Sequence, residues 1–393
     1  MAEQSLISLL SDKPDLTRYE TLYKHFHSHP ELSLQERETA STIASHLESV
    51  KAGYELFKAI GGHGIVGVLK NGSGPTVLLR ADMDGLPVLE LTGLPYASKV
   101  TMKDIADGIE KPVMHACGHD MHITCLLAAA EHLAHIKHAW SGTLIVLFQP
   151  NEERAAGAQA MVDDGLYDKI PIPDYVLGQH VLPLRAGRVG NRKGVIMGAA
   201  DSFKITVCRE VDPSEMAVVT VGSVQAGSTE NVIADHAILK VNIRTVSPRT
   251  RGKVLAAMRR IVKAECEASN SPKEPLIEPT TRFPPTVNNE NIACRLASSF
   301  TEFFKEDFDS EQPPTNGSED VSILASSIGK PYNFWFFGGV DHELWDRAEK
   351  EDRLFEDVPA NHSAFFGPTV QPTLRVGYEA LCVAALTFLR KPL

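Results

Sequence analysis

Three mostly apolar runs of strand length in the first half of the chain end in acidic or metal-ligating side chains. These runs, with the polar residues that follow them, are 76–80 with Asp82 and Asp84, 142–150 with Glu152 and Glu153, and 174–179 with His180. A continuous apolar run of this length is typical of a strand buried on both faces of a sheet. Because the carboxyl ends of parallel strands meet at one edge, the pattern predicts an open α/β sheet with a site along that edge.

The segment from His115 to His122 holds three histidines, one cysteine and one aspartate in eight positions. In an extended segment alternate side chains share a face, so His115, Cys117 and His119 would point into one cavity. A thiolate and an imidazole two positions apart form a metal corner suited to zinc, manganese, cobalt or nickel. The alternative is a helix start that Asp120 caps, with the histidines as surface groups.

Glu152 and Glu153 are adjacent, and adjacent side chains of an extended backbone point to opposite sides. One glutamate would then bind a metal while the other leans over the metal's water. Two surface glutamates at a strand end are the alternative. Asp82 and Asp84 have a similar alternative, a turn with side-chain hydrogen bonds to its own backbone.

Helical periodicity predicts helices over 15–26, 123–136 and 374–389, of which the second is strongly apolar. Ser33 and Glu36 have the spacing of a capping box, which would begin a further helix near Ser33.

The length of 393 residues exceeds what one hydrophobic core usually supports, so two domains are expected. Strands outnumber helices between residues 190 and 287, which is typical of a small antiparallel α+β domain. The elements predicted there are strands at 201–208, 217–224 and 235–246 and a helix at 247–268. We therefore predict one domain built from 1–189 and 288–393, and a second domain, 190–287, inserted into it.

Fifty acidic and thirty-nine basic residues give a formal charge of −11, which argues against nucleic acid or an anionic membrane as a partner. The first residues lack the basic region of a secretory signal, and no segment has the apolar length of a membrane span. A cytoplasmic protein is therefore expected. The six cysteines lack the spacing of a disulfide framework and are expected to be free thiols or ligands.

Eight short motifs resemble, in order and spacing, those of the dinuclear-metal aminoacylase and carboxypeptidase family, and most of all its branch of hippurate hydrolases and indoleacetyl-amino-acid hydrolases. The motifs are His29-Pro-Glu-Leu-Ser33 with Glu36, Arg80-Ala-Asp-Met-Asp-Gly-Leu-Pro87, His115-Ala-Cys-Gly-His-Asp120, Gln149-Pro-Asn-Glu-Glu153, Gly178-Gln-His180, Asn231-Val-Ile233, Gly317-Ser-Glu-Asp320 and Asn361-His-Ser363. The resemblance covers nearly the whole chain. It implies a zinc-peptidase-like catalytic domain, with an open mixed sheet flanked by helices, and an inserted ferredoxin-like lid.

The resemblance also implies roles for single residues. Two divalent ions (manganese, zinc, cobalt or nickel) would be held by Cys117, His119, Glu153, His180 and His362. Glu152 would be the general base acting on a metal-bound water, and Asp84 would orient a ligating histidine. Asn231 and Arg244 would bind the free carboxylate of the substrate, for which the guanidinium fork of Arg244 is suited. A surface strand residue is the alternative for Arg244.

The inserted domain departs from the family at one place. Cys208 passes directly to Arg209 and the next strand, so a helix-sized block that relatives carry there is missing and the lid is shortened. In relatives a histidine of that block stabilises the oxyanion, commonly in the partner subunit. Loss of one such donor costs about a hundred- to a thousandfold in rate. A homodimer through this domain is left open.

Three hypotheses follow. The first is a metal-dependent amidohydrolase that cleaves the amide bond of N-acyl or aromatic-acyl amino acids, with a dipeptidase or carboxypeptidase of the same family as its variant. The second is a catalytically impaired relative that still binds metal. The third, a purely structural metal protein, is disfavoured because a closed structural site has no use for Glu152 beside its ligands.

Overall fold

The protein is described by a computed structural model that covers residues 5–203, 217–226, 236–245, 247–315 and 317–391. The chain divides into two compact units. Unit 1 consists of Met1–Gly194, Asn288–Gln312 and Ile323–Leu393, and unit 2 of Val195–Val287 and Pro313–Ser322. Within the described residues, no helix combines the length and apolar character that crossing a membrane requires.

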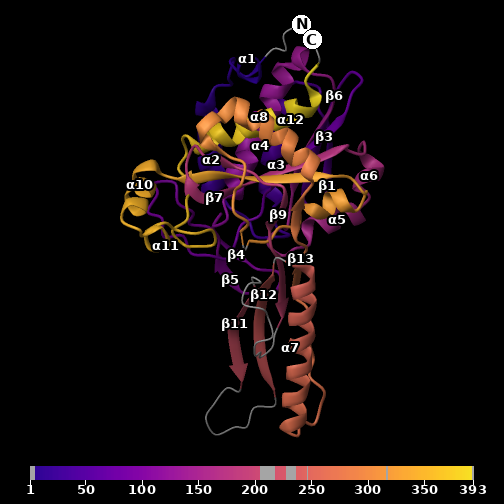
Figure 1. Ribbon diagram of the computed structural model, residues 1–393, viewed down its shortest axis with the longest axis vertical. Helices are drawn as coiled ribbons and strands as arrows, with labels where there is room; N and C mark the ends of the chain where they lie inside the picture. Colours follow the sequence, from indigo (N-terminus) through magenta and orange to yellow (C-terminus); the bar gives the residue numbers. More distant parts are fainter. Residues whose placement is uncertain (1–4, 204–216, 227–235, 246, 316, 392–393) are drawn as a thin grey trace. The chain divides into compact units, whose positions relative to one another are not determined.

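Unit 1 is built on an eight-stranded mixed sheet (Figure 1). In sheet order its strands are β1 (Glu55–Ile60), β2 (Gly64–Asn71), β6 (Gly142–Gln149), β3 (Thr76–Asp82), β7 (Tyr175–Arg185), β16 (Tyr332–Val340), β8 (Val189–Gly190) and β15 (Phe308–Asp309). The four central strands β6, β3, β7 and β16 run parallel. The predicted architecture, a large mixed sheet flanked by helices, is confirmed.

Helices cover both faces of this sheet because its central strands are apolar on both sides. Val77 and Leu79 of β3 belong to the larger core, whereas Leu78 between them belongs to the smaller core on the opposite face. The larger core packs under α4 (His119–His135) and α12 (Thr373–Leu389). Beside them, α2 (Leu16–Ser28) packs on α4, α3 (Arg37–Ser49) on α4 and β2, and α8 (Glu290–Phe304) on α12 and β16. The smaller core includes residues of α5 (Gly157–Asp163), α6 (Leu166–Lys169) and α9 (Ser322–Ser326).

The register of the parallel strands brings three chain segments to the same edge. Asp82, the last residue of β3, is level with Gln149, the last residue of β6. Arg80 is level with Gly178 of β7, so His180, two residues further on, comes level with Asp82. The residues that follow β3 and β6 therefore begin at the same edge of the sheet as His180, and at the same level.

The remaining elements of unit 1 are short. They are α1 (Leu6–Leu9), α10 (His342–Lys350), α11 (Leu354–Asp357), the hairpin of β4 (Thr101–Lys103) and β5 (Glu110–Pro112), and the 3-10 turns Lys137–Ala139 and Lys305–Asp307. β9 (Gly194–Met197) pairs with β14 (Thr286–Asn288) where the chain leaves unit 1 and returns to it.

Unit 2 contains a four-stranded sheet with one long helix. The sheet order is β11 (Ala217–Ala226), β12 (Ala237–Thr245), β10 (Ala199–Phe203) and β13 (Thr281–Phe283), and the helix is α7 (Pro248–Ala268). Val241 and Ile243 of β12 form a small core with Val254 and Met258 of α7. The predicted shortening of this domain, at Cys208 and Arg209, lies outside the described residues.

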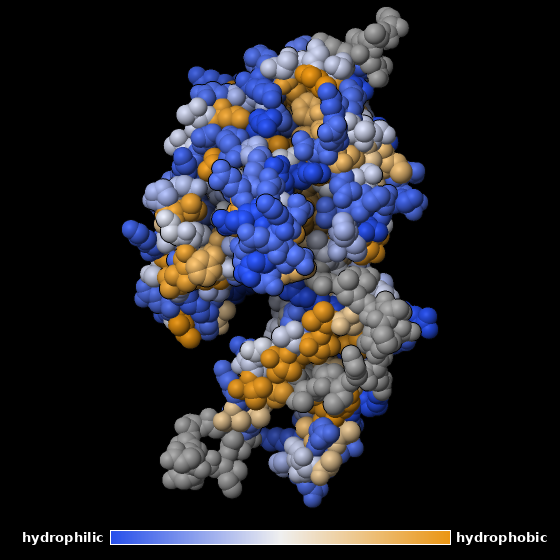
Figure 2. All heavy atoms as spheres, turned by 60° about the vertical axis from the view of Figure 1, so that its left-hand side comes forward, coloured by the Kyte–Doolittle hydropathy of each residue, from blue (hydrophilic) through white to orange (hydrophobic). Residues whose placement is uncertain are grey.

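The edge strand β11 carries exposed valines. Val219 pairs with Ile243, and Val221 with Val241, so both valines point to the sheet face that α7 covers. They nevertheless remain 38% and 42% exposed, and Figure 2 shows apolar side chains gathered on the surface of this unit. α7 thus shields β12 better than β11 among the described residues.

Close packing of α12 on α4 depends on a glycine and gives a test of the core. A Cβ added at Gly377 would lie 2.6 Å from Cys125 Sγ and 2.8 Å from Phe337 Cε2. We therefore expect Gly377→Ala to lower the free energy of unfolding by about 1–3 kcal/mol through overpacking. Denaturant titration measures it. The matched control is Gly252→Ala in α7, where a Cβ meets nothing within 4 Å. It should raise stability by about 0.5–1 kcal/mol, and an equal loss in both variants would contradict the packing argument.

Candidate metal centre

The start of α4 presents Cys117 and His119 through a tight turn. Gly118 has φ +83°, and a Cβ there would lie 2.4 Å from Val181 Cγ1, so only glycine fits. His119 is the first residue of the helix, and Cys117 lies in the turn before it. The predicted extended segment from His115 to His119 is therefore wrong. The helix start of the alternative is present, but its N-cap is Gly118 and not Asp120, and its histidines are buried rather than on the surface.

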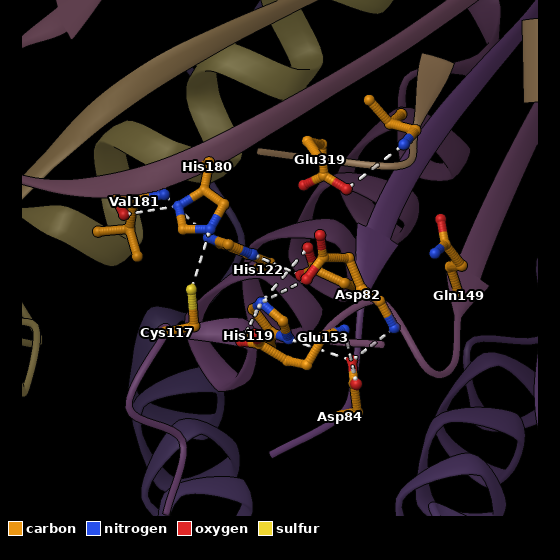
Figure 3. Close-up of polar contacts among 12 residues, drawn as sticks. Asp82, Asp84, Cys117, His119, His122, Gln149, Glu153, His180, Val181 and Glu319 are labelled. Carbon is orange, nitrogen blue, oxygen red and sulfur yellow. Dashed lines mark hydrogen bonds and ion pairs between the residues drawn. The ribbon is translucent and has the colours of Figure 1, made fainter. Parts of the chain in front are cut away.

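Side chains from distant segments converge beside this turn, and Figure 3 shows Glu153 and His180 among them, close to Cys117 and His119. Cys117 Sγ lies 3.3 Å from His180 Nε2, and His119 Nε2 lies 3.7 Å from Glu153 Oε1. His362 Nε2 lies 3.5 Å from Glu153 Oε2. Ligands that sit about 2.0–2.3 Å from a shared ion are themselves roughly 3–4 Å apart. Several groups of side chains are close enough to share an ion, and two of them combine the predicted ligands, namely Cys117 with His119 and His180, and Cys117 with Glu153 and His362.

Glu152 and Glu153 lie in a turn that follows β6, not in extended backbone as predicted. Asn151 has φ +55°, and the N–H of Ala155 donates to the carbonyl of Glu152 at 2.7 Å. The two N–H groups of Glu152 and Glu153 both donate to the Asp84 carboxylate, each at 3.1 Å. The turn directs both carboxylates toward the same imidazole, because Glu152 Oε2 is 4.0 Å from His119 Nε2.

Asp84 connects this turn to the rest of the site. Its Oδ2 accepts a hydrogen bond from the Ser33 hydroxyl at 2.7 Å, and its Oδ1 lies 3.4 Å from His119 Nδ1. Burial tends to raise the pKa of Asp84, but the contacts with His119 and Ser33 lower it below its usual value. Asp84 is thus an anion that faces the ring nitrogen of His119 opposite the one near the glutamates.

The predicted capping box at Ser33 and Glu36 is wrong. The helix begins only at Arg37, and its free N–H groups at Glu38 and Thr39 donate to the Glu31 carboxylate instead. Ser33 binds Asp84, and Glu36 Oε1 accepts the N–H of Asn151 at 2.8 Å. Both side chains therefore support the loops of the site. Their place in the family motif at 29–36 was the one sequence signal that could have indicated this.

Asp82 and His122 form a supporting layer behind the predicted ligands. His122 Nδ1 donates to Asp82 Oδ1 at 2.6 Å, and His122 Nε2 accepts the N–H of Val181 at 2.8 Å. Because both ring nitrogens are occupied, His122 has none left for a metal. Arg80 Nη1 lies 2.7 Å from Asp82 Oδ2 and offsets the charge of that carboxylate.

The last two predicted ligands are held by backbone contacts. His180 Nδ1 donates to the carbonyl of Val181 at 2.7 Å, which leaves Nε2 as the nitrogen that faces Cys117. The N–H of His362 donates to the carbonyl of Ala116 at 2.8 Å. The Asn361 amide donates to the carbonyls of Cys117 and Val181, each at 3.2 Å. These bonds fix a half-exposed histidine from near the end of the chain beside the start of α4.

The electrostatics of the cluster fit a cation. The pKa of Glu153 is raised to about 8, because burial and then the nearby carboxylates Asp84 and Asp82 raise it against the opposing effect of His119. Burial lowers the pKa of His119, but Asp82 and Asp84 outweigh it and raise that pKa to about 10. Glu153 Oε1 is buried without a hydrogen-bond donor among the described residues. Crowded buried carboxylates of this kind are neutralised by divalent ions.

The residues predicted to bind the substrate carboxylate lie in unit 2. Arg244 is in β12, is half-buried, and its Nε donates to Asn242 Oδ1 at 3.0 Å. Asn231 lies outside the described residues.

Comparison with known proteins agrees with the family indicated by the motifs. Residues 78–360 match the model of peptidase family M20/M25/M40. The chain belongs to this family. Hippurate hydrolase from Campylobacter jejuni is 34% identical over 350 residues, which cover 80% of this chain and 87% of the relative. The IAA-amino acid hydrolase ILR1-like 5 of Arabidopsis thaliana is 28% identical, over 85% of this chain and 80% of the relative. Both relatives are hydrolases.

The fold also matches a solved structure of the family. The YXEP protein of Bacillus subtilis, described as a dinuclear metal binding peptidase, superposes with a TM-score of 0.71 at 27% identity. The match covers 94% of this chain and 97% of that chain. The predicted family and the predicted mixed α/β fold are thus confirmed, whereas the shortened lid stays a prediction.

The Asp84 contacts generate a test of the site. Asp84→Asn puts an amide N–H₂ where two backbone N–H groups and the Ser33 hydroxyl donate, so the turn of Glu152 and Glu153 should shift. We expect the affinity for Zn²⁺ or Mn²⁺ to fall about 10–100-fold, as is usual when a partner of a ligand is changed. Competition with a chromogenic chelator measures it. Asp163→Asn, on an exposed part of α5, is the control and should bind metal as the wild type does. Equal affinity in both variants would contradict the role of Asp84.

Proposed function

We propose that this chain is a metal-dependent amidohydrolase that cleaves the amide bond of N-acyl or aromatic-acyl amino acids. One observation carries the proposal. His119 Nε2 is 3.7 Å from a carboxylate oxygen of Glu153 and 4.0 Å from one of Glu152, so a predicted ligand and a predicted base flank the same imidazole. The names of the two relatives above, a hippurate hydrolase and an IAA-amino acid hydrolase, support this substrate class.

In this proposal Cys117, His119, Glu153, His180 and His362 hold two divalent ions. The donor set of thiolate, imidazoles and carboxylate suits zinc, manganese, cobalt or nickel. Bound ions of this kind acidify water and polarise an amide carbonyl. The description of the Bacillus subtilis structure as dinuclear supports two ions rather than one.

Glu152 is the general base in this proposal. Its residue is only 4% exposed, and its N–H is tied to Asp84, so the carboxylate has a fixed origin and a largely dry surrounding. It would take a proton from the attacking water and return it to the leaving amine. Asp84 would hold the base and the ligands in position through its contacts with His119 and with the turn.

Asn231 and Arg244 would bind the free carboxylate of the amino acid product end. The guanidinium of Arg244 offers paired N–H donors that match a carboxylate, which is the reason for this assignment. A dipeptidase or carboxypeptidase would use the same residues for a peptide C-terminus and is the variant of this proposal.

A catalytically impaired metal-binding protein is the second candidate. Its support is the direct passage from Cys208 to Arg209, where relatives of this branch carry the block with the oxyanion-stabilising histidine. It predicts that the ions bind while hydrolysis is slow by about a hundred- to a thousandfold. Sedimentation of the full chain measures whether a homodimer forms.

The role of Glu152 gives the central test. Glu152→Gln keeps the shape but cannot accept the proton, so kcat for N-benzoylglycine should fall about 10²–10⁴-fold while bound metal is unchanged. Hydrolysis is followed by release of free glycine, and metal by elemental analysis. Glu351→Gln, on an exposed turn, is the control. Activity that survives Glu152→Gln would disprove the assignment. Bound metal without wild-type turnover would favour the impaired candidate.

Arg244 gives a test of substrate class. Arg244→Ala should raise KM for N-benzoylglycine about 10–100-fold, because a hydrogen bond to a charged group is worth about 1.5–3 kcal/mol. It should leave the weak hydrolysis of N-benzoylglycinamide, which lacks the carboxylate, unchanged. Steady-state kinetics on the two substrates makes the comparison, with Lys253→Ala on α7 as control. An equal effect on both substrates would remove Arg244 from carboxylate recognition.

A further inference from the structure

His27 is a buried histidine that the proposed reaction does not use. It lies near the end of α2, and its side chain is fully buried. Nδ1 is 2.7 Å from Asp120 Oδ2, and Nε2 is 3.0 Å from Glu90 Oε1. Because a carboxylate only accepts hydrogen bonds, a ring between two carboxylates donates from both nitrogens and is an imidazolium. Burial opposes this charge, but the two carboxylates outweigh burial and raise the pKa of His27 to about 9.

The second oxygen of each carboxylate is also occupied. Asp120 Oδ1 accepts the N–H of Met121 at 2.9 Å, and Glu90 Oε2 accepts the N–H of Ser98 at 2.6 Å. The rings of Tyr96 and Tyr23 pack against His27, with centroids at 5.2 Å and 5.6 Å. The cluster of Glu90, His27 and Asp120 is therefore closed on all sides by named contacts. It joins three segments, namely α2, the first turn of α4 and the loop from Glu90 to Ser98.

Two of these segments lead directly to predicted ligands. Asp120 follows His119 in the chain, so its position sets the first turn of α4. Leu91, next to Glu90, donates its N–H to the carbonyl of Ala364 at 2.8 Å, two residues beyond His362. The cluster thus contacts two segments that carry predicted ligands far apart in the sequence, those of His119 and His362.

We propose that His27 is a positioning residue of the metal centre, whose imidazolium holds the first turn of α4 against the loop that packs on the His362 segment. This inference rests on the metal centre of the proposed function. Ligands must be held within a few tenths of an ångström of their geometry, and outer partners provide that constraint. A bond that only stabilised the fold would leave the geometry at the metal unchanged.

The test uses Co²⁺ as the probe and the full chain in three forms, wild type, His27→Gln and His25→Gln. His25 lies two residues away on α2 and is exposed, so it is a matched control. We expect His27→Gln to bind Co²⁺ about tenfold or more weakly and to change the visible absorption of the bound ion. His25→Gln should match the wild type in both measurements. Wild-type affinity and spectrum in His27→Gln would overturn the inference.

Loss of the imidazolium leaves two buried carboxylates facing each other, which is strongly destabilising. The double variant His27→Gln/Glu90→Gln removes one of these charges and is measured in the same way if the single variant does not fold. An independent measurement uses the wild type with ¹⁵N-labelled histidine. Two protonated ring nitrogens on His27 near neutral pH support the proposed positioning role of His27, and a neutral ring overturns it. If the wild type itself binds no Co²⁺, the proposed metal centre fails. If only the role of His27 fails, the wild type binds Co²⁺ and His27→Gln binds it equally well.

Discussion

The buried carboxylate of Asp84 is the contact on which the geometry of the candidate site depends. It is 1% exposed and accepts hydrogen bonds from two successive backbone N–H groups and from the Ser33 hydroxyl, with His119 at 3.4 Å. Burial disfavours a carboxylate anion, and only such a set of donors makes it tolerable. The same donors are the parts that must be placed: the turn of the two glutamates, the 29–36 segment and the first imidazole of α4. The donors that offset the cost of burying Asp84 are therefore the same groups whose positions define the site.

The sheet brings these polar groups to one edge, although its interior is apolar. β3, β6 and β7 are parallel, so Asp82, Gln149 and His180 reach one edge at the same level. α4 is buried nearly all round between the sheet and the outer helices, and its first turn cannot shift without disturbing that core. Rigid backbone on two sides lets carboxylates crowd at the edge, and the raised pKa of Glu153 reflects the crowding. The site therefore has an excess of buried carboxylate charge, which the proposed cations would neutralise.

The sequence predicted the elements better than their local geometry. Apolar runs and helical periodicity depend on burial, which is a property of many residues, so the mixed sheet, α4 and α12 were predictable. Extended backbone at Cys117 and Glu153 was predicted and is wrong, because Gly118 and Asn151 turn the chain through positive φ. Ser33 and Glu36 matched a local capping pattern, yet Ser33 donates to Asp84, and Glu36 accepts the N–H of Asn151 as well as that of its neighbour Leu34. Single-sequence patterns report neighbours in sequence and miss bonds of this range. The convergence of His362 with Glu153 could be expected only from resemblance to the family.

The two units carry different parts of the proposed chemistry, which bears on the predicted shortening of the inserted domain. All five predicted ligands, Glu152 and Asp84 belong to unit 1, whereas Arg244 belongs to unit 2. Unit 1 has its own sheet and both of the larger cores. Unit 2 has a small core under a single described helix, and valines of its edge strand remain exposed. Under the proposed function, a change in unit 2 would therefore act on substrate binding before it acts on metal affinity. The proposed metal binding and the proposed turnover can therefore be tested separately, because the contacts that hold the predicted ligands lie within unit 1.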